Sequence, residues 1–492
     1  MRRFPCWKNL KQKKNLSFNL VGATPHSVNI GFHGGRVLQR FLRGLALTIV
    51  GPGVFFGSYS AFASDLETTM RAALVHSASL AAARQNWIAV REDIGTNSAT
   101  RDWKATGTIT GTHARTDAAT VSGGYKDAQT AVGTISLSKN LYDGGQQTEG
   151  VKLDQLLLDK ETATYEGREQ TVLLAAIEAH LAVIKAKRDV ELNLINVERL
   201  ESHVNAAQIR VDAGAATPTR LAEAEARLAR GRSSLIVAQT ALSNAEDSFR
   251  VLTGTDPAAL EVPPALTNLP QTVIEAEEFA RKSHPDVLAA RAGELAAEQS
   301  FSTLTASVRP SLAFSLNASD TNAEGEGSDK TVLSAQLTMS TPLMITSATR
   351  AKTRNLSAKL AAARYARDDA LRSSGLQARE TFRNLETARG QLAAVMAEVE
   401  ASRLVAVGIR NEFEFGQKTS LDVQDAEQDV NDAEIRLVSA QHGVLTAGYR
   451  LQAALGRLTS SAMGLDDVIG TLQSEPAPTA RLGKILPFVG ND

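Results

Sequence analysis

Two aspartates stand three residues apart directly after a glycine turn, in the stretch FEFGQKTSLDVQDA (Phe413–Ala426). Thr419 is well placed as the N-cap of a following helix, with Asp422 at the third helical position. A carboxylate there stabilises the helix N-terminus through the helix dipole, and Asp425 would then be a second, solvated acid. Positions three apart also share one face of a helix. If that face lined a pore, the paired carboxylates would favour cations and repel anions.

Enzymatic and cofactor chemistry has little support in the sequence. Ser136 and Lys139 have the spacing of a serine–lysine pair, but they fall in an expected β-strand and not at a helix start. The eight histidines form no H-E-x-x-H zinc motif, and no phosphate-binding loop is present. The single cysteine, Cys6, lies in the leader. We therefore expect a protein that is not an enzyme and that needs no cofactor or metal.

Residues 1–63 are expected to be a signal peptide or leader. They hold nine Lys or Arg residues and no Asp or Glu, whereas acids exceed bases in the rest of the chain. This asymmetry favours targeting over a nucleic-acid partner. The apolar run Leu45–Phe56 is too short to span a membrane, and an A-x-A site at 61–63 places the expected mature start near Ser64.

The rest of the chain repeats itself. An offset of 202 takes Gly214 to Gly416 and Thr217, which precedes Pro218, to Thr419, and further upstream the offset is 207. A period of this length indicates a duplicated unit of domain size. The expected divisions are a first repeat at 64–256, a linker at 257–283, a second repeat at 284–458 and a C-terminal tail at 459–492.

Each repeat is expected to contain a helix, a β-hairpin, a long helix, a turn and another helix. The hairpins are expected at 103–141 and 310–343, where side chains alternate with period two as in membrane β-strands. The long helices, near 148–210 and 349–410, are followed by segments with a 3-4 apolar seam, which is typical of a coiled coil. Four strands cannot close a membrane barrel, so the chain should oligomerise. The alternative is a periplasmic or cell-surface coiled-coil scaffold without a pore.

The segment that joins the first hairpin to the first long helix, LYDGG, resembles the L-[FY]-x-G-G motif of the TolC-like outer-membrane efflux proteins. The repeated G-x-x-T turns and RPSLAFSLNAS at the third strand also resemble that family. The second repeat has LMITSATR where the family often carries a glycine pair, so we expect its strand-to-helix bend to be built differently. The strand-to-helix motif consists of Leu141, Tyr142, Asp143, Gly144 and Gly145.

The resemblance implies an α+β membrane protein that is internally duplicated. Three copies would form an outer-membrane β-barrel, with four strands per protomer, continuous with a long periplasmic α-helical coiled-coil barrel. Such a homotrimer is an exit duct for small-molecule efflux or type I protein secretion. It contacts outer-membrane lipid, a periplasmic adaptor (membrane fusion) protein and, through the adaptor, an inner-membrane ABC or RND-type transporter. No nucleic acid or cofactor is implied.

The resemblance also implies roles for the two turns. The second turn would form the periplasmic constriction, with Asp422 and Asp425 lining the aperture, and the turns at Gly214 and Gly416 would contact the adaptor. Lys418 and Arg220 would repel each other, so we expect Arg220 to pair with Asp422 or Asp425 instead. Phe413 lacks the hydroxyl that an aromatic residue there can carry in the family. The residues expected to form a gate latch are Phe413, Lys418, Arg220 and Thr219.

Overall fold

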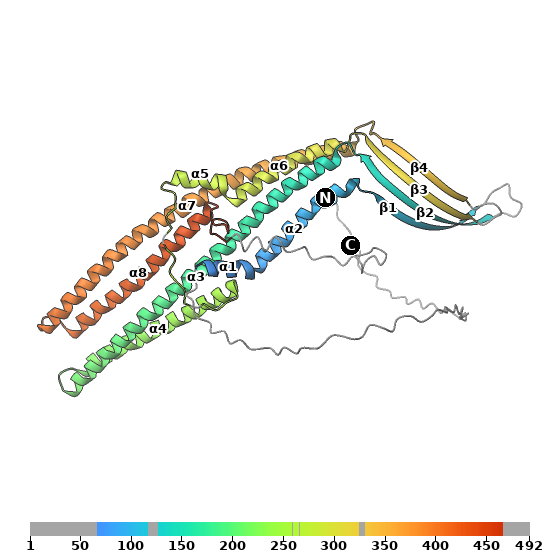
Figure 1. Ribbon diagram of the computed structural model, residues 1–492. Helices are drawn as coiled ribbons and strands as arrows, with labels where there is room; N and C mark the ends of the chain where they lie inside the picture. The colour runs from blue at the N-terminus through green and yellow to red at the C-terminus, as the bar shows by residue number, and fades with distance from the viewer. Residues whose placement is uncertain (1–65, 117–125, 258, 265, 324–329, 466–492) are drawn as a thin grey trace, which may run out of the picture. The chain divides into compact units, whose positions relative to one another are not determined.

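The computed structural model describes residues 66–116, 126–257, 259–264, 266–323 and 330–465. The leader, the expected cleavage site near Ser64 and residues 466–492 of the expected tail lie outside this part of the chain. Figure 1 shows the elements in chain order. Two helices, two strands, a long helix and a shorter helix occur in that order, and the same order then recurs in the second half.

The first half contains α1 (Leu66–His76), α2 (Ala78–Ser98), a 3-10 turn (Ala99–Arg101), β1 (Lys104–Thr116), β2 (Lys126–Tyr142), α3 (Gln146–Asp212) and α4 (Pro218–Thr253). The second half contains α5 (Val273–Ser283), α6 (Pro285–Ala306), β3 (Ser311–Ala323), β4 (Lys330–Ser340), α7 (Ser347–Glu414) and α8 (Ser420–Ala454). Helices α3 and α4 form one hairpin, and α7 and α8 form the other (Figure 1).

Helix α5 lies inside the segment 257–283 that was expected to be linker. The Thr272 side chain accepts a hydrogen bond from the Glu275 N–H at 3.2 Å and so caps the helix. Ala276 and Ala280, one turn apart, are completely buried in a cluster that includes Phe382 of α7. The expectation was wrong because the prolines that suggested a linker end at Pro270, before this amphipathic helix begins.

The strands form one antiparallel sheet in the order β1-β2-β3-β4, so the central β2–β3 pair joins the two halves of the chain. Its two faces differ in chemistry. In antiparallel pairing, residues opposite each other point to the same face. One row across the sheet is Gly107, Ile135, Ala318 and Leu333. The adjacent row, which points to the other face, is Thr106, Ser136, Asn317 and Ser334. The sheet therefore has an apolar face and a polar face.

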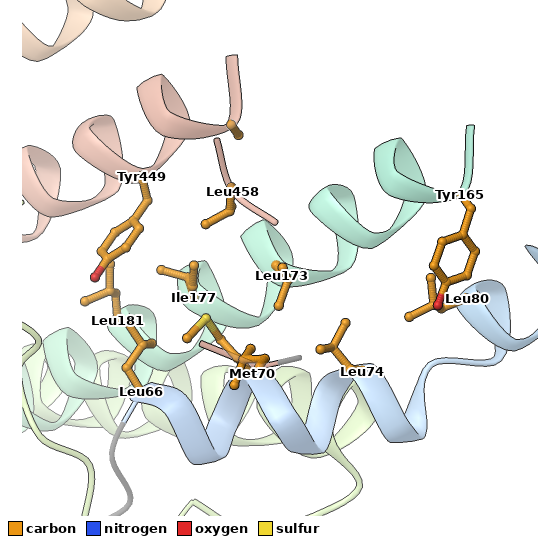
Figure 2. Close-up of a cluster of buried hydrophobic side chains, with 12 residues drawn as sticks. Leu66, Met70, Leu74, Leu80, Tyr165, Leu173, Ile177, Leu181, Tyr449 and Leu458 are labelled. Atoms are coloured by element: carbon orange, nitrogen blue, oxygen red, sulfur yellow. The ribbon is translucent and has the colours of Figure 1, made fainter. Parts of the chain in front are cut away.

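An apolar core ties together the beginning, middle and end of the described chain. Figure 2 shows side chains of α1 packed against α3, with Leu458 beyond the end of α8 beside them. Leu173, Ile177 and Leu458 are completely buried. The labelled members are Leu66, Met70, Leu74, Leu80, Tyr165, Leu173, Ile177, Leu181, Tyr449 and Leu458.

Two glycines allow α4 to end close to α1 and α8 to end close to α5. Gly254 and Gly456 follow α4 and α8 with left-handed backbones, at φ 71° and 70°. A Cβ on Gly254 would lie 2.6 Å from Nδ1 of His76, at the end of α1. A Cβ on Gly456 would overlap the backbone carbonyl of Ser283, at the end of α5. Both positions therefore require glycine for conformation and for space.

We predict that Gly456→Ala lowers the free energy of unfolding by at least about 1–2 kcal/mol, the cost of a left-handed alanine, with the overlap on Ser283 adding to it. The measurement is the thermal unfolding midpoint of the purified protein. Gly443→Ala is the matched control, because a Cβ on this α8 glycine would meet no atom within 4 Å. Equal midpoints for Gly456→Ala and Gly443→Ala would contradict the assignment.

Candidate functional site

The α3–α4 and α7–α8 turns have the same backbone geometry. Gly214 and Gly416 are left-handed, at φ 71° and 74°, and nothing within 4 Å would meet a Cβ at either. Each glycine N–H donates to the carbonyl three residues back, and the next N–H donates to the carbonyl five residues back. This is the Schellman ending of a helix. Glycine is therefore required here by the turn itself.

The start of α8 carries the capping box that the sequence predicts. The Thr419 side chain accepts from the Asp422 N–H at 3.3 Å, while Asp422 accepts from the Thr419 N–H at 2.7 Å and from its hydroxyl at 2.7 Å. In the first hairpin, Thr217 holds the N-cap position before Pro218 but makes no side-chain cap hydrogen bond. The two turns therefore differ in how the second helix begins.

The Asp422 carboxylate is held in its charged form. Hydrogen bonds from the hydroxyl and the N–H of Thr419 lower the pKa of Asp422, and the positive charges of Lys418 and Arg220 contribute further. Lys418 is exposed on the turn. Asp422 therefore both caps α8 and presents a negative charge at the tip of the hairpin.

Asp425 pairs with a different arginine from the one expected. Its Oδ1 lies 2.6 Å from the Arg227 guanidinium of α4, and its side chain is 57% exposed. Arg220 instead pairs with Glu223 on its own helix at 3.3 Å, and it acts on Asp422 only as a nearby charge. The expectation missed Arg227 because Arg220 and Arg227, seven residues apart, lie on the same helix face, and the sequence does not show which of the two is level with Asp425.

The expected latch residues are only partly brought together. The Arg210 guanidinium lies over the Phe413 ring, 5.6 Å from the centre of that ring. Phe413 and Arg220 line one cleft of about 450 Å³ between the two turns, together with His203, Arg210, Thr217 and Thr419. Thr219 is exposed in the first turn of α4, outside that lining.

A buried carboxylate beside this cleft was missed by sequence reasoning. Glu427 of α8 is 8% exposed. It accepts from Nε2 of His203, on α3, at 2.7 Å and from the Arg410 guanidinium of α7. Burial by itself raises the pKa of Glu427, but these two partners outweigh it and lower the pKa below its ordinary value. No local sequence pattern predicts this carboxylate, because its partners come from two other helices.

The strand-to-helix motif is built around Asp143. Its carboxylate accepts from Arg101 at 2.7 Å and from the N–H groups of Gly145 and Gln147 at 3.1 and 3.0 Å. Burial acts to raise the pKa of Asp143, but these hydrogen bonds outweigh it and lower the pKa. Gly144 is left-handed, and a Cβ there would lie 2.8 Å from that of Arg309. Leu141 and Tyr142 are half exposed at the end of β2.

The corresponding bend of the second half is built differently, as expected from its sequence. The Thr346 hydroxyl accepts from the Thr349 N–H at 3.2 Å and caps α7. Residues 341–345 connect β4 to this cap, without a left-handed glycine.

The described residues offer neither a metal site nor a membrane-spanning helix. No group of three or more His, Cys, Asp or Glu side chains in this part of the chain is arranged to hold a metal ion. Among the helices described, none has both the length and the apolar character that crossing a membrane requires.

The family model, the relatives and the solved structures that resemble this chain all point to the same protein family. The model of the outer membrane efflux protein family matches residues 69–255 and 278–457. Outer membrane efflux protein BepC of Brucella suis is 29% identical over 333 residues, 67% of this chain and 73% of its own. Alkaline protease secretion protein AprF of Pseudomonas aeruginosa is 24% identical, covering 69% and 72%. The crystal structure of the Campylobacter jejuni CmeC outer membrane channel superposes with a TM-score of 0.69 at 14% identity, covering 84% of this chain and 90% of that one.

We predict that the capping charge of Asp422 makes stability depend on pH. Because its pKa is lowered by folding, the stabilisation is present at neutral pH and is lost as the pH falls through the folded pKa, below the ordinary aspartate value of about 4. Asp422→Asn should therefore unfold at a lower temperature than wild type at pH 7, and this difference should be smaller at pH 3. Asp429→Asn, an exposed acid of the same helix, is the control. A difference unchanged between these pH values would rule out the charge effect.

Proposed function

The chain belongs to the outer membrane efflux protein family, whose members are outer-membrane channels with a periplasmic extension and not enzymes, and we propose that three copies of it form one continuous exit duct. In this proposal the strands of the three copies close a twelve-stranded barrel in the outer membrane. The helical hairpins continue the duct into the periplasm.

The sheet carries this proposal. Its apolar face suits lipid and its polar face suits a water-filled lumen, the alternation found in membrane barrels. The outer edges of β1 and β4 have no neighbouring strand in the described chain. Unpaired backbone groups are costly in lipid, and pairing β4 of one copy with β1 of the next satisfies them.

Two ion pairs at equivalent positions of the two hairpins support internal duplication. Glu201 of α3 meets Arg232 of α4 at 2.8 Å, and Arg403 of α7 meets Glu434 of α8 at 2.6 Å. Adding 202 to the residue numbers of Glu201 and Arg232 gives those of Arg403 and Glu434. The same interhelical contact is thus made twice, with the charges exchanged. We propose that the two hairpins descend from one unit.

The proposed duct works with partners on the periplasmic side. Members of this family act with an adaptor and an inner-membrane transporter. We propose that the turns at Gly214 and Gly416 contact the adaptor and that the transporter is of the ABC or RND type. Among the relatives, one is named for efflux and another for alkaline protease secretion. Cargo of either class, a small molecule or a secreted protein, fits such a duct.

The narrow end of the proposed duct is the α7–α8 turn. Asp422 and Asp425 would contribute six carboxylates from three copies, a ring that attracts cations. The Asp425 carboxylate is partly neutralised by Arg227. We therefore propose that Arg227 sets how much negative charge the ring presents.

We predict that the purified protein forms heat-resistant trimers in detergent and gives single-channel conductance in planar lipid bilayers. A closed twelve-stranded barrel resists detergent, and its continuous lumen conducts ions. Monomeric, water-soluble protein without conductance would contradict the duct and favour a coiled-coil scaffold.

We predict that Asp422→Ala combined with Asp425→Ala reduces cation selectivity and weakens block by polyvalent cations, because the carboxylate ring is removed. Arg227→Gln should shift selectivity in the opposite direction, because it leaves Asp425 without its partner. The measurement is the reversal potential in asymmetric KCl across a planar bilayer. An unchanged reversal potential in both variants would exclude the ring.

A further inference from the structure

Glu427 joins three helices that belong to both hairpins. It lies on α8, in the second hairpin, and its Oε2 is 2.7 Å from Nε2 of His203 on α3, in the first. Its Oε1 pairs with Arg410 of α7. The backbone carbonyl of the same residue accepts from the Arg199 guanidinium of α3 at 3.3 Å. The side chain and the backbone of Glu427 thus both link α8 to α3, and its side chain also links α8 to α7.

The burial of Glu427 makes these contacts matter. A carboxylate taken out of water is costly unless hydrogen bonds and opposite charges compensate it. The side chain of Glu427 is only 10% exposed, whereas that of Arg410 is 60% exposed. Removing the charge at the buried position releases both partners at once. Exposed ion pairs, by contrast, contribute little to holding helices together.

The cluster lies close to the candidate aperture. Glu427 follows Asp425 by two residues and Asp422 by five on one helix, which corresponds to about 3 and 7.5 Å along its axis. His203 also lines the cleft between the two turns, together with Phe413 and Arg220. The charged side chains that line this cleft or contact Glu427 are Arg199, His203 and Arg210 from α3, Arg220 and Glu223 from α4, and Arg410 from α7.

The equivalent glutamate of the first hairpin provides a contrast. An offset of 202 takes Glu225 of α4 to Glu427 of α8, but Glu225 is exposed. The residues equivalent to its partners also differ, because Gln208 stands 202 residues before Arg410 and Val405 stands 202 residues after His203. At these two equivalent positions, therefore, the carboxylate is buried only in the hairpin that carries the paired aspartates.

We propose that Glu427 is a positioning residue that holds the start of α8 against α3 and α7 and thereby keeps Asp422 and Asp425 in the narrow state of the duct. This inference rests on the proposed function, since it presupposes an aperture at the α7–α8 turn. Glu427 acts through the position of its helix and does not itself touch the transported molecule.

The test is single-channel conductance of Glu427→Gln in planar bilayers, with Glu225→Gln as the matched control. Glutamine keeps the size of the side chain but loses the negative charge that pairs with Arg410 and replaces one acceptor oxygen with an NH2 group. The contacts to His203 and Arg410 should therefore weaken, the helix should move away and the aperture should widen. We expect conductance to rise roughly twofold or more, since conductance follows the width of a constriction. Glu225→Gln should conduct like wild type. Arg410→Gln, at a more exposed side chain, should also raise conductance and guards against a folding defect in Glu427→Gln.

The outcomes separate this inference from the proposed function. Wild-type protein without conductance would refute the duct itself. If the wild-type protein conducts, and both Glu427→Gln and Arg410→Gln form trimers with the same conductance as wild type, only the role of Glu427 is overturned. Loss of trimers in both variants would also overturn it, because the cluster would then serve assembly and not aperture width. A rise equal to that of Glu225→Gln would show a general effect of removing acids and would count against the inference.

Discussion

Backbone hydrogen bonding at the two edges of the sheet is the constraint on which the proposed architecture depends. The described sheet has four strands, and its outer strands, β1 and β4, each offer one unpaired edge. In water such edges are tolerable, but in lipid they are not. A chain with this sheet can enter a membrane only when other copies complete the barrel. The separation of apolar and polar rows across the sheet agrees with that requirement, since a closed barrel gives each face its own solvent.

The two halves share backbone features and differ in the charges at the candidate aperture. Gly214 and Gly416 make the same Schellman turn, and Gly254 and Gly456 make the same close approach to a preceding helix. These shared features concern backbone conformation and space. At the turns the two halves differ in charged side chains, because the second half has Asp422 and Asp425 in place of Arg220 and Glu223. The geometry of a turn is thus repeated while its electrostatics has changed.

The sequence predicts local features well and contacts between distant segments poorly. The capping box at Thr419 follows from residue types at fixed spacing, and the structure confirms it. The different bend before α7 was also expected, because LMITSATR lacks the glycine pair. In contrast, α5 was missed because neighbouring prolines suggested a linker. The Arg227–Asp425 pair and the Glu427 cluster depend on how two long hairpins align, and side-chain periodicity within one helix carries no information on that alignment.

The contacts between helices change along the hairpins, from apolar side chains far from the turns to charged and hydrogen-bonded side chains near them. Around Leu173, Ile177 and Leu458 the helices share a buried apolar core, which is costly to separate. Nearer the turns, Val197, Leu200 and Leu228 form a small apolar cluster, and beyond it the contacts between hairpins include Arg227–Asp425 and His203–Glu427. Charged and hydrogen-bonded groups can exchange a protein partner for water when they separate, whereas apolar side chains cannot. Opening of the tips therefore requires less free energy than separation of the base, and motion would be confined to the region that carries the candidate aperture.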